Sequence, residues 1–303
     1  MSHSRERIYA FPTRNKSRVT SYIIMQQTIK KSITFSDVGL HSGNKCNLTI
    51  KPAPANTGII FKRIDLSDNN EIPLCLNNVN LEKSKRRTVL KNKVGVEISS
   101  VEHLLSALNG LGIDNALIDL DSEEVPALKG NSLEFVDKIM DAGVKSLCEK
   151  KNHFKISSPT LFYENDTTVI GLPDEHFKVT YIVDFQDKVV GIQSKSIIVT
   201  PQNYINEIAP ARTFGFEKEI DELLNKGLIK GGSLDSALII DENDYINPNK
   251  EMPDEVVRHK IMDIIGDLYI LGKPIIGHII AYKAGHYSHI RFLKELDKRQ
   301  GTT

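Results

Sequence analysis

The sequence predicts an α+β fold in two domains, and three observations support this prediction. The chain has 303 residues, 40% of them hydrophobic, which is enough material for two ordinary packed cores. Short strand patterns follow one another and helix patterns come after them, an order typical of α+β proteins rather than of a doubly wound parallel sheet. Both halves of the chain show this order, so we expect domains at residues 25–148 and 149–303.

Alternating apolar and polar residues predict short strands in the first half, with turn residues between them. Residues 100–109 instead carry apolar side chains at i, i+3, i+4 and i+7, which predicts a helix that Gly110 and Gly112 end. Gly143 ends a second predicted helix in the same way. In order, we expect strands at 29–35, 48–50 and 59–61, a helix at 100–109, a strand at 116–120 and a helix at 133–142.

The second half repeats these patterns after a candidate linker at residues 148–153, where charged residues separate apolar segments. The final strand precedes Lys283-Ala-Gly-His286, and its glycine predicts a loop that carries His286. We expect strands near 155–156, 168–172, 179–185 and 197–200, helices near 217–226 and 253–271, and a final strand at 275–282.

Composition excludes several classes of protein. Lys plus Arg (39) equal Asp plus Glu (39), so there is no net positive charge to bind a polyanion, and we expect no nucleic-acid partner. No apolar run approaches the roughly 18 to 20 residues that span a bilayer, so we expect no transmembrane segment. Three widely spaced cysteines indicate neither a disulfide framework nor a thiolate zinc cluster and suit the cytoplasm. Residues 1–24 are basic and lack a secretory apolar core, which predicts a disordered extension, with Met25 a plausible start.

The helix expected from residue 253 carries the densest polar stripe of the chain. His259, Asp263 and Asp267 recur every four residues, and a histidine and an aspartate one turn apart can offer two ligands to one metal. The chain has nine histidines and 39 acidic residues, so about one histidine should have an acidic residue four positions later by chance. A solvated helix face therefore stays open as an alternative on this evidence.

The segment SSVEH at residues 99–103 also has two interpretations. Ser99 followed by Glu102 three residues later is a capping box, which would leave His103 as a partly buried imidazole. Alternatively, His103 is a third metal ligand and Glu102 is a general base. Two histidines and one carboxylate leave a fourth zinc position open, which is typical of catalytic zinc.

Other polar residues keep simpler alternatives. His286 could be a general acid or an idle surface residue, and contact with Asp267 would favour its protonated form. His278 is expected to be a satisfied core residue within the final strand. The charge run at residues 83–87 is expected to be a solvated loop, with phosphate binding as the alternative.

Seven segments in this order resemble one family, the zinc-dependent UDP-3-O-acyl-N-acetylglucosamine deacetylases of lipid A synthesis. The similarity runs from about residue 26 to residue 296. Two positions depart from the family pattern: Lys129-Gly-Asn131 stands where relatives commonly have Asp-Gly-Ser, and Arg87 where they have a small or sulfur-bearing residue. The matching segments are VGLHSG at 38–43, PAPANTG at 52–58, SVEH at 100–103, GIDN at 112–115, APARTFGF at 209–216, GGSLD at 231–235 and VRHKIMDIIGD at 257–267.

The resemblance implies a fold and a reaction. The family fold has two α+β domains of similar topology whose sheets sandwich a central layer of helices, with the active site at the domain junction. The implied reaction removes acetate from the 2-acetamido group of UDP-3-O-[(3R)-3-hydroxyacyl]-N-acetylglucosamine, the committed step of lipid A biosynthesis. An amide carbonyl is a poor electrophile, so this chemistry needs a metal that polarises it and activates water.

The resemblance also implies a role for each site residue. His103, His259 and Asp263 bind Zn²⁺, although such a ligand set also suits iron(II). The implied catalytic residues are Glu102 as base, His286 acting on the leaving amine or the oxyanion, Thr213 at the oxyanion, and Asp267. Lys260 and Lys283 match positions that meet the diphosphate, and the segment 214–234 matches the acyl-chain passage, with Phe214, Ile220, Leu223, Leu224, Ile229 and Leu234 as its apolar surface.

Two other classes of function remain as alternatives. A zinc- or nucleotide-binding module without activity would not need Glu102 beside His103. An RNA-binding protein would use residues 83–93 and the basic amino-terminal arm, and its binding would depend steeply on salt. No acyl-chain length or oligomeric state follows from these patterns.

Overall fold

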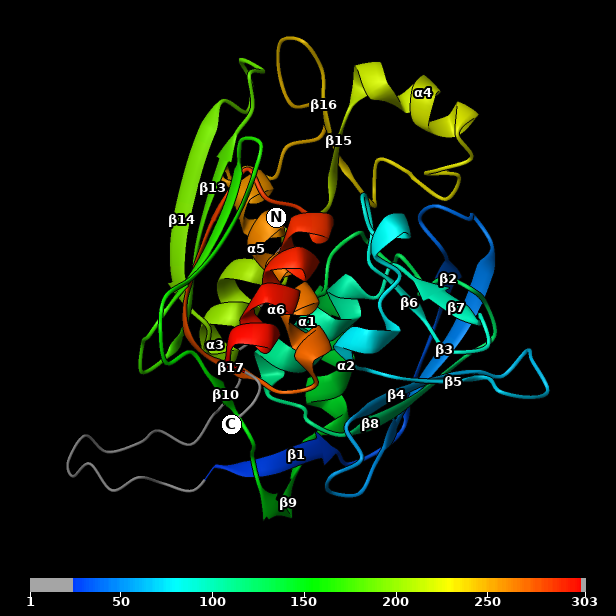
Figure 1. Ribbon diagram of the computed structural model, residues 1–303. Coiled ribbons are helices and arrows are strands. Elements are labelled where there is room, and N and C mark those ends of the chain that lie inside the picture. Colours follow the sequence, from blue (N-terminus) through cyan, green and yellow to red (C-terminus); the bar gives the residue numbers. More distant parts are fainter. Residues whose placement is uncertain (1–23, 301–303) are drawn as a thin grey trace, which may run out of the picture.

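The computed structural model of the chain describes residues 24–300, and in this range it is a mixed structure of several sheets and six α-helices. The predicted amino-terminal extension lies outside the described residues, except for Ile24. Two large sheets form opposite sides of the molecule, and the longest helices lie between them (Figure 1). The predicted α+β class is therefore confirmed.

The first sheet has five strands, and residues of alternating polarity form it. Phe35, Leu48, Ile50 and Phe61 are buried on the face toward the helices, while the residues between them are more exposed. Strands β4 and β8 run parallel, and the other pairs are antiparallel. The strand order is β2 (Ile33–Val38), β3 (Lys45–Pro52), β8 (Ala116–Leu120), β4 (Ile59–Arg63), β5 (Glu71–Pro73).

The second sheet has six strands, with β17 (Ile275–Tyr282) at its centre. Alternate residues of β17 are buried against the helices, and this strand pairs in parallel with β13 and β10. The path of the sheet is β11 (Thr160–Glu164), β12 (Thr167–Leu172), β17, β13 (Phe177–Asp184), β14 (Ile192–Ile198), with β10 (Phe154–Lys155) beside β17.

Four helices fill the space between the sheets: α1 (Glu102–Leu111), α2 (Leu133–Ala142), α5 (Glu255–Leu268) and α6 (His286–Gln300) (Figure 1). Helices α1 and α5 are in direct contact. A Cβ atom on Gly266 would lie 2.0 Å from the carbonyl oxygen of Glu102, so only glycine permits this approach. Asn109 also donates to the carbonyl of Ile265 across the same contact, at 3.0 Å. This packing fixes the two helices that carry the polar stripe and the SVEH segment.

Smaller elements complete the described chain. Strand β1 (Met25–Ile29) pairs with β9 (Val144–Lys150), β6 (Val89–Lys91) with β7 (Glu97–Ser99), and β15 (Phe214–Phe216) with β16 (Leu238–Ile240). The short helices are α3 (Pro201–Asn203), α4 (Ile220–Asn225), the π-helix η3 (Tyr204–Ile208) and the 3₁₀ helices η1 (Leu76–Asn78), η2 (Leu81–Lys83), η4 (Glu217–Glu219) and η5 (Tyr269–Leu271).

Three local predictions are wrong. His286 is not on a loop, because it is the first residue of α6. The strand expected at 197–200 lies earlier, since Pro201 starts α3 and β14 ends at Ile198. The first three residues of the candidate linker belong to β9, where pairing with β1 orders them. The domain boundary itself stays a prediction.

The structure also tests the predictions for His278, for the charge run at residues 83–87 and for membrane-spanning helices. His278 is half-buried rather than in the core, and its Nε2 lies 2.8 Å from the Thr180 hydroxyl. The charge run at 83–87 is only partly solvated, because Arg86 forms an ion pair with Glu219 and Arg87 is half-buried. Within residues 24–300 no helix combines the length and the apolar character needed to cross a membrane.

Candidate active site

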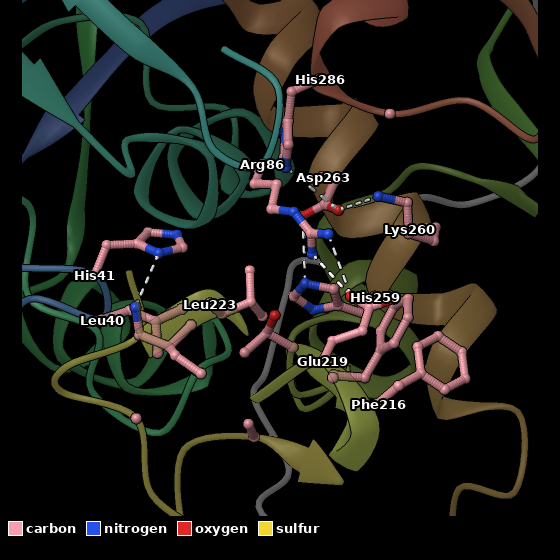
Figure 2. Close-up of a pocket in the computed structure, with 18 of the residues that line it drawn as sticks. Leu40, His41, Arg86, Phe216, Glu219, Leu223, His259, Lys260, Asp263 and His286 are labelled. Atoms are coloured by element: carbon pink, nitrogen blue, oxygen red, sulfur yellow. Dashed lines mark hydrogen bonds and ion pairs between the residues drawn. The ribbon is translucent and has the colours of Figure 1, made fainter. Parts of the chain in front are cut away.

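The main pocket, about 950 Å³ in volume, lies where α1, α5 and the start of α6 meet the segment 213–239. Figure 2 shows side chains from these elements pointing into a shared space, with Asp263, His259 and Lys260 coming from α5. Every predicted site residue except Asp267 lines this pocket: Glu102, His103, Thr213, Phe214, Ile220, Leu223, Leu224, Ile229, Leu234, His259, Lys260, Asp263, Lys283 and His286.

Two histidines and one aspartate converge in the pocket. His103 comes from the first turn of α1, and His259 and Asp263 lie one turn apart on α5. The Nε2 atoms of His103 and His259 lie 3.6 Å and 3.3 Å from Oδ1 of Asp263. One ligand atom from each residue lies within 4.8 Å of the others, so the three could hold one cation.

The chemistry of these three side chains fits a metal. Oδ1 of Asp263 is buried and has no hydrogen-bond partner among the described residues, which is unusual for a buried carboxylate oxygen. Nδ1 of His259 faces the carbonyl oxygen of Ala211 at 3.1 Å and must donate to it, which leaves Nε2 free to bind. Burial lowers the pKa of His259 to about 3, so the ring is neutral, as a metal ligand must be.

A second cluster of possible ligands is held by hydrogen bonds instead. Asp267, His286 and His289 are all buried within α5 and α6. Nδ1 of each ring lies 2.8 Å from Oδ2 of Asp267, which is an ordinary hydrogen-bond distance. Asp267 therefore does contact His286, which is the condition under which we expected the protonated form of His286 to be favoured.

Glu102 is buried beside His103 and faces the same pocket. Its Oε2 accepts a hydrogen bond from the backbone N–H of Thr88 at 3.0 Å, and its Oε1 lies 3.9 Å from Nε2 of His286. Burial raises the pKa of Glu102, although the two nearby histidines oppose this shift. A buried carboxylate of raised pKa beside a candidate metal site suits proton transfer near neutral pH.

The capping-box interpretation of Ser99 and Glu102 is wrong, and Glu102 instead lines the pocket. Val101 is the N-cap residue of α1 and makes no capping hydrogen bond through its side chain. Ser99 ends strand β7 and its hydroxyl donates to the carbonyl of Glu123, while Ser100 has a positive φ of 58°. This backbone turn directs Glu102 into the pocket instead of back toward the helix terminus.

His286 carries the opposite electrostatic perturbation. Burial acts against its protonation, but the carboxylates of Asp267 and Asp263 outweigh burial and raise the pKa of His286 to about 9. Asp267 shows the reverse effect, because His286 lowers its pKa despite burial. Nε2 of His286 and the carboxylate of Glu102 lie 3.9 Å apart, and the opposite perturbations of these two groups suit an acid and a base.

Thr213 precedes strand β15 at the pocket wall, and its backbone N–H donates to the carbonyl of Gly130 at 2.7 Å. The preceding residue, Arg212, is tied to α5. Its Nε and Nη2 donate to the two carboxylate oxygens of buried Glu255 at 2.9 Å and 3.0 Å. This bidentate pair joins the segment of Thr213 to the helix of His259.

The two lysines of the predicted diphosphate site have carboxylate partners. Nζ of Lys260 donates to Oδ2 of Asp263 at 2.7 Å, the contact drawn as a dashed line in Figure 2. Nζ of Lys283 lies 3.3 Å from Asp166 and 3.4 Å from Asp184. Both lysines line the pocket, so each could exchange its partner for a phosphate.

Several residues of the site were not among the candidates predicted from the sequence. Arg86 extends across the pocket toward Glu219, and His41 lies beside Leu40 at the apolar end (Figure 2). Thr88 and His289 lie behind the pocket and contact Asp267. A signal existed for His289 alone: it follows His286 by three residues, which is one helical turn, but recognising it required the prediction of α6.

Fold and pocket together define a class of protein, the α+β proteins whose pocket can hold a cation between two packed helices. Comparison with known proteins narrows this class. The model of the LpxC family, UDP-3-O-acyl N-acetylglycosamine deacetylase, matches residues 26–298, and the chain belongs to this family. It is therefore a deacetylase, that is, an amide hydrolase.

Curated relatives match nearly the whole chain. UDP-3-O-acyl-N-acetylglucosamine deacetylase of Thermodesulfovibrio yellowstonii is 41% identical over 271 residues, 89% of this chain and 91% of that protein. The deacetylase of the same name from Idiomarina loihiensis is 41% identical over 281 residues, 92% of this chain and 91% of the relative. That of Legionella pneumophila is 42% identical with the same coverage.

Proposed function

We propose that the chain hydrolyses the 2-acetamido group of UDP-3-O-[(3R)-3-hydroxyacyl]-N-acetylglucosamine and releases acetate. The observation that carries the proposal is the convergence of His103, His259 and Asp263 beside Glu102 and His286. The substrate follows from the names of the relatives, which cover about nine tenths of the chain.

A cation, Zn²⁺ or iron(II), would be held by His103, His259 and Asp263. When bound, it supplies Lewis-acid polarisation of the amide carbonyl and lowers the pKa of water. Glu102 takes the proton from the attacking water, since its carboxylate is buried and aligned by Thr88. His286 donates a proton to the departing nitrogen, and its bond to Asp267 holds the ring for this transfer.

The remaining residues bind and orient the substrate. The hydroxyl of Thr213 donates to the oxyanion that develops on the carbonyl, which is a large stabilising effect in such reactions. Lys260 and Lys283 bind the diphosphate as point charges. The acyl chain enters the passage formed by Phe214, Ile220, Leu223, Ile229 and Leu234, and each buried methylene contributes about 0.8 kcal/mol.

The test is acetate release from this substrate by the purified full chain. Protein as isolated, after chelation, and after the addition of zinc or iron(II) is compared with Glu102→Gln, which keeps the size of the side chain and removes the base. We expect activity to be lost on chelation, restored by metal, and reduced by at least about 100-fold in Glu102→Gln. A folded, metal-loaded protein that releases no acetate would refute the proposal.

A further inference from the structure

The carboxylate of Asp267 is held on both of its oxygens. Asp267 is completely buried on α5, one turn after Asp263. Its Oδ2 accepts hydrogen bonds from Nδ1 of His286 and Nδ1 of His289, each at 2.8 Å. Its Oδ1 accepts a hydrogen bond from the hydroxyl of Thr88 at 2.5 Å. Two of these three donors, the hydroxyl of Thr88 and Nδ1 of His289, have no role in the proposed mechanism.

His289 is oriented so that it can only donate to Asp267. A carboxylate accepts hydrogen bonds, so Nδ1 of His289 must carry its hydrogen. The other ring nitrogen lies 3.2 Å from the hydroxyl of Tyr181, which donates to the carbonyl of Ala284 at 2.5 Å. Burial lowers the pKa of His289, in agreement with a neutral ring whose one N–H points at Asp267.

Thr88 joins Asp267 to the proposed base. Its backbone N–H donates to Oε2 of Glu102 at 3.0 Å, and its hydroxyl donates to Asp267. Thr88 therefore contacts both carboxylates that flank His286, because Glu102 lies 3.9 Å from Nε2 and Asp267 lies 2.8 Å from Nδ1 of that ring. Thr88 and His289 are fully buried and do not line the pocket, so neither can touch a substrate there.

A carboxylate bound to one ring alone can rotate about its Cβ–Cγ bond, and the ring would follow it. Donors on both oxygens fix the plane of the carboxylate and hence the direction of the ring. We propose that Thr88 and His289 are positioning residues that clamp Asp267 from two sides and thereby aim Nε2 of His286 into the pocket. This inference rests on the proposed function of His286.

Matched pairs of variants separate positioning from packing. His289→Asn keeps an N–H donor at the δ position of the side chain, whereas His289→Leu removes it. Thr88→Ser keeps the hydroxyl, whereas Thr88→Val removes it and leaves the backbone bond to Glu102 available. We expect kcat to fall about tenfold in His289→Leu and in Thr88→Val, with KM changed less than about twofold, and to recover in His289→Asn and Thr88→Ser.

A second measurement does not depend on activity. In zinc-loaded protein labelled with ¹⁵N-histidine, the ring signals of His286, assigned by their loss in His286→Gln, should shift in His289→Leu and return in His289→Asn. If kcat and these signals stay unchanged in both donor-less variants, the proposal is wrong. It is also wrong if His289→Asn and Thr88→Ser are as impaired as His289→Leu and Thr88→Val, since packing would then explain the loss.

The two proposals can fail separately. If the unmodified protein releases no acetate but His289→Leu still shifts the ring signals of His286, the deacetylase mechanism fails and the clamp stands. Melting curves identify any variant that does not fold, and in that case the other pair decides. Thr88 directly precedes β6 and His289 lies on α6, so one unstable variant does not remove both tests.

Discussion

The ion pair between Arg212 and Glu255 allows a direct test of how the site is held. Two guanidinium nitrogens donate to the carboxylate, and Glu255 is only 2% exposed. In Arg212→Met the carboxylate of Glu255 stays buried and loses both guanidinium hydrogen bonds. It keeps the hydrogen bond from the backbone N–H of residue 212, at 2.8 Å. We expect the free energy of unfolding to fall by about 3–5 kcal/mol, because an uncompensated charge remains in the interior.

The control is the double variant Arg212→Met/Glu255→Leu, in which no charge is left behind. Apolar replacement of a buried pair is often close to neutral, but the backbone N–H of residue 212 then lacks its acceptor, so this protein should lose only about 1–3 kcal/mol, less than Arg212→Met. Urea unfolding followed by circular dichroism, with chelator in every sample so that metal binding does not contribute, gives the midpoints and slopes. The reasoning is refuted if Arg212→Met costs less than about 1 kcal/mol, or if the double variant costs the sum of the singles.

Three further predictions use steady-state kinetics or unfolding. Gly130 has a φ of 66°, and a Cβ atom there would lie 1.7 Å from the carbonyl oxygen of Ser236. Gly130→Ala should therefore displace the segment of Thr213 and lower kcat by about 100-fold. An unchanged kcat would contradict this prediction. Leu223→Trp should narrow the passage and raise KM for long acyl chains more than for short ones, and an equal change for all lengths would count against the passage. Burial lowers the pKa of His41 to about 4, below the ordinary 6.5. The unfolded chain therefore takes up a proton at His41 before the folded chain does, so the stability that the neutral ring contributes is present above pH 6.5 and is lost as the pH falls toward 4. His41→Gln should remove about 3 kcal/mol of that pH dependence in urea unfolding, whereas a profile like that of the unmodified chain would show that His41 is not the cause.

The periodic elements of the fold could be predicted from the sequence. Helices α1 and α5 carry regular apolar stripes that are buried between the sheets, so their pattern reports their packing. Helix α6 was missed, although Ile290, Leu293 and Leu296 are all completely buried on it. Its many charged residues and the glycine before it resemble a loop, and only tertiary packing distinguishes the two.

The candidate site was only partly predictable from spacing. His259 and Asp263 are one helical turn apart, which the sequence shows, but the approach of His103 depends on the contact between α1 and α5. Family resemblance therefore supplied what periodicity could not. Thr88 has no local pattern that marks it, and the spacing of His289 from His286 has meaning only once α6 is known, because the role of both residues depends on segments that meet only in the folded chain.

The close contact of α1 and α5 at Gly266 has a consequence for biosynthesis of the protein. One candidate ligand lies on α1 and the other two on α5, so a nascent chain that ends before His259 holds one donor of the three. A product truncated before His259 thus has no means of assembling the complete ligand set. Metal content per chain would then show whether translation has passed α5 and whether the two helices have docked correctly.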